Sequence, residues 1–151
     1  MSDEPAYDIE VTRLLDAPPA AVYRAFIDAG EFARWYGPPG FPVRQDSVEV
    51  DARINGVHRF TMVSEADPAM RTGFTGRFTE VIPGVVLASS GTWDGIPGVD
   101  GPWPSNLRVE FHAEGDKTRL VLREGPHPPG TAELGRQAWD VMLPKLAAIV
   151  A

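Results

Sequence analysis

The chain sets Trp35 and Tyr36 directly before an abrupt helix stop, in the stretch Glu31-Phe32-Ala33-Arg34-Trp35-Tyr36-Gly37-Pro38-Pro39-Gly40. Proline lacks an amide donor and disfavours helical backbone in the residue before it, so the Gly-Pro-Pro-Gly run must end a helix that begins near Glu31. Two adjacent large aromatic side chains at a forced bend are costly to expose to water. We therefore expect them to wall a concave interior, with Trp35 closing one end of it.

Upstream of this bend, the pattern predicts a strand followed by a helix. Residues 8–15 alternate apolar and polar side chains, which is the period of a strand with one face in water. Asp16 or Ala17 lies near the cap of a helix whose first turn tolerates the prolines that follow, and Gly30 ends this helix. A second short helix is predicted over residues 31–36.

From the bend to about residue 124, apolar side chains recur at about every second position. Six strands are predicted, around residues 48–51, 57–62, 74–80, 85–93, 107–112 and 118–123. Successive strands with hairpin-like connections form an antiparallel sheet. The proline- and glycine-rich residues 94–105 are predicted to be one long irregular loop.

Residues 132–150 carry the pattern of a long helix. Its apolar stripe consists of Leu134, Ala138, Met142, Leu146 and Ile149, widened by Trp139, Leu143 and Val150. So wide an apolar face must be covered, and a curved sheet can grip it. The sequence therefore predicts one α+β domain over residues 1–151, in which a curved antiparallel sheet wraps around the C-terminal helix and two short helices follow the first strand.

Composition narrows the classes of function. The 151 residues carry a net charge of -7 and have an isoelectric point near 4.9, whereas phosphate binding needs a basic stripe, so we expect no nucleic-acid partner. The absence of cysteine excludes disulfides and thiolate nucleophiles. No apolar run approaches the roughly 18 residues of a membrane span, and the start Met1-Ser2-Asp3-Glu4-Pro5 is polar, so we expect no membrane insertion and a cytoplasmic location.

Five segments in order resemble a known family. They include Phe32-Ala33-Arg34-Trp35-Tyr36-Gly37-Pro38, together with residues 17–26, 56–62, 76–83 and 139–146. They are similar to the START/Bet v 1-like (SRPBCC) helix-grip superfamily, and more narrowly to the branch related to the C-terminal domain of the activator of Hsp90 ATPase. The chain departs from that branch at Tyr36, where many relatives have a second tryptophan, and at Ala138, where glycine is common. The resemblance implies an apolar cavity between the sheet and the long helix, in a fold that hosts binders, co-chaperone domains and cyclases alike.

The residues expected to face this cavity are largely aromatic. The candidate ligand-binding set is Trp35, Phe41, His58, Phe60, Met62, Phe74, Phe78, Trp93, Phe111, Trp139 and Met142. Apolar rows opposite an amphipathic helix can also simply fill a core. The excess of bulky aromatic side chains around one histidine favours a lined pocket.

Two titratable residues are candidates for proton transfer. His58 could contact a ligand or act as a base near neutral pH, or it could bond a nearby backbone or carboxylate group instead. Glu80 is in phase with Phe78 and could place a carboxylate at the pocket's edge, or it could pair with an arginine such as Arg53 or Arg77.

The remaining histidines do not suggest a metal. His112 shares a phase with polar neighbours and is expected to face solvent, while His127 lies in a proline-rich loop that could rim the cavity mouth. The three histidines lack the close spacing of a zinc site, so we predict neither a metal nor another cofactor.

Two functions of different classes remain. The favoured one is a non-catalytic binder of a hydrophobic small molecule, such as a lipid, a polyketide or an aromatic metabolite. The alternative is an enzyme of the cyclase or hydrolase type in which His58 or Glu80 moves a proton, although no nucleophile elbow or phosphate-binding loop is present. A weaker alternative is a co-chaperone surface for an Hsp90-like partner. We expect a monomer or a homodimer.

Overall fold

The computed structural model describes residues 6–151, so the polar start of the chain lies outside it. Within that range the elements are β1 (Ile9–Leu15), α1 (Pro19–Ile27), α2 (Ala29–Trp35), a 3₁₀ turn (Gln45–Ser47), β2 (Glu49–Val50), β3 (Val57–Val63), β4 (Arg71–Ile82), β5 (Val86–Asp94), β6 (Trp103–Glu114), β7 (Lys117–Gly125) and α3 (Ala132–Val150).

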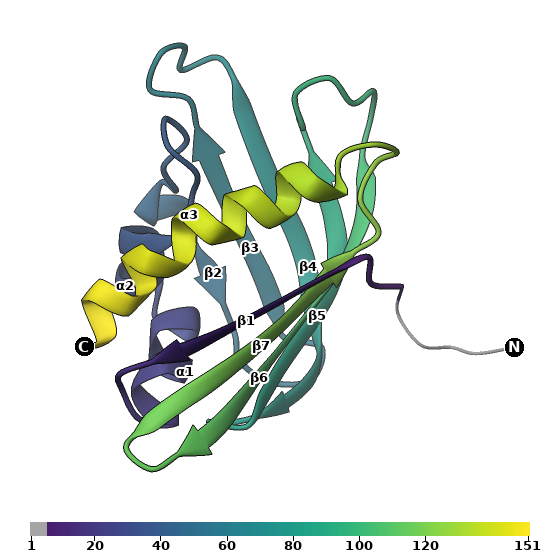
Figure 1. Cartoon of the computed structure of the whole chain (residues 1–151). Coiled ribbons are helices and arrows are strands. Elements are labelled where there is room, and N and C mark those ends of the chain that lie inside the picture. Colours follow the sequence, from purple (N-terminus) through teal and green to yellow (C-terminus); the bar gives the residue numbers. More distant parts are fainter. Residues whose placement is uncertain (1–5) are drawn as a thin grey trace, which may run out of the picture.

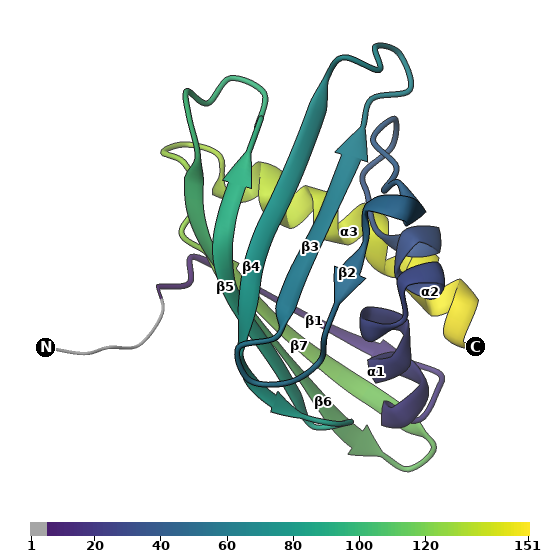
Figure 2. The ribbon, with the colours of Figure 1, turned by 180° about the vertical axis from the view of Figure 1, so that it is seen from behind.

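The seven strands form one curved antiparallel sheet in the order β1-β7-β6-β5-β4-β3-β2. Because β1 and β2 are the two edge strands, α1 and α2 carry the chain from one edge to the other. The long helix α3 crosses the face of the sheet from which Figure 1 is viewed. Seen from behind, in Figure 2, the sheet lies in front of α3. The predicted sheet wrapped around a C-terminal helix, with two short helices after the first strand, is confirmed.

The bend after α2 is built as its sequence predicts, but the predicted helix bounds before it are wrong, since α1 ends at Ile27 and Gly30 lies within α2. Asp28 caps this helix, since its side chain accepts a hydrogen bond of 2.9 Å from the backbone N–H of Glu31. The helix ends at Trp35, and Gly37 then adopts a φ of 111°, which favours glycine. A Cβ at Gly37 would lie 2.4 Å from the carbonyl oxygen of Phe41, so no other residue fits this bend.

The predicted long irregular loop is shorter in the structure. β5 continues to Asp94 and β6 begins at Trp103, so the predicted boundaries of 94 and 105 are wrong. The reason is strand pairing: Trp93 lies opposite Trp103, and this aromatic pair continues the β5–β6 ladder through residues that the proline and glycine content had suggested were irregular.

One face of the sheet supplies the core. Inward positions alternate along the strands, as in β3, where His58, Phe60 and Met62 are buried. They meet the buried side chains of α3, which include Trp139 and Met142. In the described part of the chain, no helix is both long and apolar enough to cross a membrane.

Candidate ligand-binding site

Two adjoining spaces lie between the sheet and α3. The larger one, which we call the outer cleft, has a volume of about 390 Å³ and opens between α3, the β5–β6 loop and the segment after β7. The smaller one, the inner chamber, has a volume of about 20 Å³ and lies deeper against the sheet. The two spaces adjoin, because the same five residues line both: Tyr36, Trp93, Ser105, Glu124 and Trp139.

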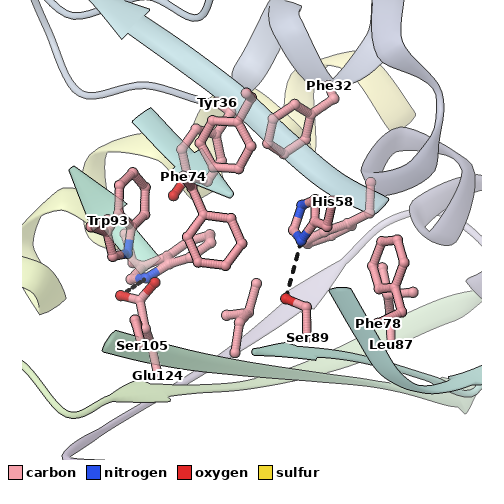
Figure 3. A pocket seen from close by; sticks show the side chains of 14 residues that line it. Phe32, Tyr36, His58, Phe74, Phe78, Leu87, Ser89, Trp93, Ser105 and Glu124 are labelled. Atoms are coloured by element: carbon pink, nitrogen blue, oxygen red, sulfur yellow. Dashed lines mark hydrogen bonds between the residues drawn. The ribbon is translucent and has the colours of Figure 1, made fainter. Parts of the chain in front are cut away.

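The inner chamber is an aromatic cage with a few polar groups. Figure 3 shows Trp93, Phe74, Tyr36 and His58 around one space, with Ser89, Ser105 and Glu124 at its base. The rest of its lining is apolar: Phe26, Phe32, Phe60, Phe78, Leu87, Leu107 and Trp139, the last bonded to Glu124. A volume of this size accommodates about one water molecule. The chamber can therefore hold one small polar group.

Two glycines shape the wall of the chamber at Phe74. Gly76 and Gly91 lie opposite each other on β4 and β5. A Cβ at Gly76 would come within 2.9 Å of the Phe74 ring, and a Cβ at Gly91 within 2.8 Å. Both positions must therefore stay without a side chain for Phe74 to lie across the sheet.

His58 places a neutral imidazole in the chamber. Its Nδ1 lies 3.1 Å from the Ser89 hydroxyl oxygen, and its ring stacks on Phe78 with centroids 4.9 Å apart. Burial lowers the pKa of His58 to about 4, so the ring is uncharged at neutral pH. Within residues 6–151 its Nε2 has no hydrogen-bond partner, yet no side-chain nitrogen or oxygen there is both fully buried and unpartnered. Nε2 therefore reaches the open space of the chamber.

Glu124 brings a buried carboxylate to the boundary of the two spaces. Its Oε1 accepts hydrogen bonds from Trp139 Nε1, at 3.1 Å, and from His127 Nε2, at 3.2 Å. His127 also bonds Asp8 twice, through Nδ1 at 2.6 Å and through its backbone N–H at 2.7 Å. Glu124 first, and then Asp8, raise the pKa of His127 to about 9, so its ring is an imidazolium at neutral pH. We call this arrangement the Glu124–His127–Asp8 clasp.

A glycine in the first turns of α3 makes room for the clasp. A Cβ at Gly135 would lie 2.3 Å from Nε2 of His127, the atom that bonds Glu124. Only glycine lets α3 approach the imidazole this closely. The clasp thus joins Asp8, the residue before β1, to the end of β7, and Trp139 of α3 donates a hydrogen bond to its Glu124.

Tyr36 lies at the bend after α2 and lines both the inner chamber and the outer cleft. Burial first, and the Glu124 carboxylate second, raise the pKa of its hydroxyl well above the ordinary value, so the phenol stays neutral. Among the described residues its hydroxyl has no hydrogen-bond partner, and, as for His58, the oxygen is not fully buried. It therefore faces the space that Tyr36 lines.

Comparison with known proteins decides the family. The family model of activator of Hsp90 ATPase homolog 1-like protein matches residues 16–151. The chain belongs to this family. It is the branch of the SRPBCC superfamily that the five sequence segments resembled.

Solved structures share this fold. A protein from Chromobacterium violaceum is 29% identical, with a TM-score of 0.82 over 94% of this chain and 95% of its own. A family member from Silicibacter pomeroyi is 22% identical, with a TM-score of 0.76 over 93% of this chain and 95% of its own. An activator-like protein from Aeromonas hydrophila is 21% identical, with a TM-score of 0.72 over 94% and 92%. No curated protein matches the chain in sequence.

Most of the predicted ligand-binding residues line one of the two spaces. The inner chamber has His58, Phe60, Phe74 and Phe78, the outer cleft has Phe41, Met62 and Met142, and both have Trp93 and Trp139. His127 rims the outer cleft as predicted, and His112 is largely exposed and bonds Glu110. Whether these residues bind a ligand stays a prediction.

The predicted placement of Trp35 and Phe111 is wrong, since neither lines the inner chamber or the outer cleft. Trp35 is completely buried, and its Nε1 donates a 2.9 Å hydrogen bond to the carbonyl of Ala25 in α1. Phe111 packs edge-on against Tyr23 and Phe26 beneath the same helix. Both residues hold α1 in the core, and Tyr36 takes the place at the cavity that we expected for Trp35.

The predicted placement of Glu80 at the pocket's edge is also wrong. A β-bulge between Phe78 and Glu80 shifts the register of β4, so that Glu80 leaves the inward phase. Its carboxylate instead accepts a 2.5 Å hydrogen bond from Arg108, and lines neither space. Pairing of Glu80 with an arginine was the alternative prediction, although the arginine is Arg108 and not Arg53 or Arg77.

Sequence reasoning missed Glu124 and Ser89 as cavity residues, and it expected Tyr36 in the wall without including it among the ligand-binding residues. The signal for Glu124 was present, because it continues the inward phase of Leu120 and Leu122 along β7. A carboxylate in such a phase is unusual and points to a specific polar contact. Within residues 6–151, no group of three or more histidine and acidic side chains is arranged to hold a metal ion.

Proposed function

We propose that this protein binds a hydrophobic small molecule, a lipid, polyketide or aromatic metabolite, in the outer cleft. The observation that carries the proposal is the cleft itself: about 390 Å³ of space, lined mostly by apolar side chains. Ligand pockets in proteins have volumes of about 300–1,000 Å³ and are predominantly apolar with a few polar groups. The fold of this family suits the binding of a small molecule or of another protein.

The mouth of the cleft supports this proposal. Leu134, in the first turns of α3, belongs to the apolar stripe that we expected to be covered, yet 63% of it is exposed. It lines the cleft opposite the segment of Ile96 and Pro97 in the β5–β6 loop, with Trp103 on the next strand. A bound apolar molecule would cover these side chains, and each Å² removed from water contributes about 25 cal/mol.

Filling the cleft tests this function. The neutral fluorescent probe N-phenyl-1-naphthylamine is titrated into the wild type, into Ala138→Trp, which fills the cleft, and into the control Val141→Trp. Ala138 lines the cleft, whereas Val141 lies on the exposed side of the same helix. We expect the wild type and Val141→Trp to bind the probe equally and Ala138→Trp to bind it at least tenfold more weakly. Equal binding by all three proteins, or binding by none, would refute the proposal.

Proton-transfer catalysis has less support. A base with a pKa of about 4 drives proton abstraction weakly at neutral pH, and His58 has such a pKa. Glu80 lies on the opposite face of the sheet from the cavity, paired with Arg108. A hydrogen bond to a ligand, rather than catalysis, is the role we propose for His58.

Protein binding is the second candidate, because the matching family is named for an activator of the Hsp90 ATPase. It would be supported if the purified protein raised the ATPase rate of the Hsp90 of its own host. An unchanged rate at a saturating concentration of the protein would remove this candidate and leave small-molecule binding unaffected.

A further inference from the structure

We propose that the inner chamber is a binding site for one neutral hydroxyl group, so that the ligand is an amphipathic alcohol or phenol. Its apolar body would lie in the outer cleft, and its hydroxyl would enter the chamber between Tyr36 and Glu124. This inference rests on the proposed function and specifies the class of ligand.

The size of the chamber sets the first limit. A cavity needs about 10–15 Å³ to hold one water molecule, and the chamber offers about 20 Å³. A hydroxyl group is of this size, whereas a carboxylate, a phosphate or a quaternary ammonium group is larger. The aromatic walls of Phe74, Trp93 and Trp139 leave no room beside it.

The polar atoms around the chamber set the second limit. Within residues 6–151, four of its polar groups have hydrogen-bonding capacity that no other residue uses: the Tyr36 hydroxyl, the Ser105 hydroxyl, Nε2 of His58 and the second carboxylate oxygen of Glu124. Tyr36 can donate, and Glu124 can only accept. A hydroxyl both donates and accepts, so one such group can satisfy both residues at once. An alkane or an ether would leave the second carboxylate oxygen of Glu124 without a donor.

Charge sets the third limit. The Glu124–His127–Asp8 clasp combines two carboxylates with one imidazolium, so its formal charge is negative. An anionic head group at Glu124 would be repelled in a space from which water is largely excluded. A cationic head group would have to lose its hydration, while Glu124 already pairs with the charged His127. A neutral hydroxyl avoids both costs.

A displacement series tests the inference on the whole protein. The probe N-phenyl-1-naphthylamine is displaced by 1-decanol, by its methyl-ether counterpart 1-methoxynonane and by decanoate. We expect 1-decanol to bind roughly tenfold more tightly than 1-methoxynonane, which is the effect of one hydrogen bond to a charged group, and decanoate to bind most weakly. The pair 4-hexylphenol and 4-hexylanisole, compared in the same way, distinguishes an aryl from an alkyl body.

Two variants separate recognition of the hydroxyl from stability. Tyr36→Phe keeps the ring, and Glu124→Gln keeps the shape of the side chain, so each should weaken 1-decanol several-fold and leave 1-methoxynonane unchanged. Glu80→Gln, on the opposite face of the sheet, is the control and should change neither. If Glu124→Gln does not fold, Tyr36→Phe alone decides.

The outcomes separate this inference from the proposed function. If the probe binds and the alcohol is no tighter than the ether, or decanoate is the tightest, the hydroxyl site is refuted and the apolar binding function stands. If the probe binds and none of the compounds displaces it, the hydroxyl site alone is refuted. If the probe does not bind, both are refuted.

Discussion

Acid should destabilise this protein through His58 more than through an ordinary histidine. The pKa of His58 is about 4 in the folded protein and near 6.5 when the chain is unfolded. Between these values the unfolded chain binds a proton that the folded protein does not, so the free energy of unfolding falls as the pH is lowered from 6.5 to 4. A difference of about 2.5 pKa units corresponds to about 3 kcal/mol. This is a large part of the 5–15 kcal/mol that is typical of domain stability.

Urea unfolding measures this effect directly. The free energy of unfolding is determined at intervals from pH 7 to pH 4 for the wild type, for His58→Gln and for the control His112→Gln. Carboxylates also titrate in this range, but they contribute equally to all three proteins, so the difference between proteins isolates each histidine. We expect the wild type to lose about 3 kcal/mol relative to His58→Gln over the range. His112→Gln should follow the wild type, because His112 is exposed at the outer face.

A constant difference between the wild type and His58→Gln, within about 0.5 kcal/mol from pH 7 to pH 4, would refute this reasoning. It would mean that the imidazole is protonated in the folded protein as easily as in the unfolded chain. The same result would weaken the assignment of His58 as a neutral hydrogen-bonding group of the chamber.

The clasp and the core allow four further predictions. His127 has a raised pKa, so its contribution to stability is complete below pH 6.5 and is lost as the pH rises through about 9; urea unfolding should show this loss in the wild type but not in His127→Gln. An NMR titration of the wild type should place the His127 pKa near 9, and an ordinary value near 6.5 would contradict the clasp. Gly135→Ala in an ordinary helix would gain up to about 1 kcal/mol, but here we expect a lower melting temperature and a lower His127 pKa, because the new Cβ displaces the imidazole from Glu124; a more stable variant would contradict this. Trp35→Phe removes the hydrogen bond to Ala25 and should lower stability by about 1–3 kcal/mol while leaving probe affinity unchanged; tighter or faster probe binding would instead support the expectation that Trp35 closes one end of the cavity.

The sequence predicted the fold because several local signals agreed. Alternation in β3 identified His58, Phe60 and Met62 as inward residues, and the helical stripe identified Trp139 and Met142 as their partners. These periods depend only on neighbouring residues in the chain. The resemblance of the five segments supplied the arrangement of sheet and helix that local periods alone do not specify.

The errors arose where tertiary contacts override local period. One extra residue at the β-bulge turned Glu80 to the outer face, and no residue type announces such a bulge. At the end of α2, Trp35 and Tyr36 are adjacent, and which of them faces the cavity depends on how α2 packs against α1. The clasp joins Asp8 to His127 across 119 positions of sequence, which no local pattern reveals.

A crystal structure of the protein grown with 1-decanol would test the central claim most directly. We predict that the alkyl chain lies in the outer cleft between Trp103 and Leu134, and that the hydroxyl lies in the inner chamber within hydrogen-bond distance of Glu124. A chain bound with its hydroxyl at the mouth of the cleft would contradict the hydroxyl site. An empty cleft in crystals saturated with 1-decanol would contradict the binding function itself.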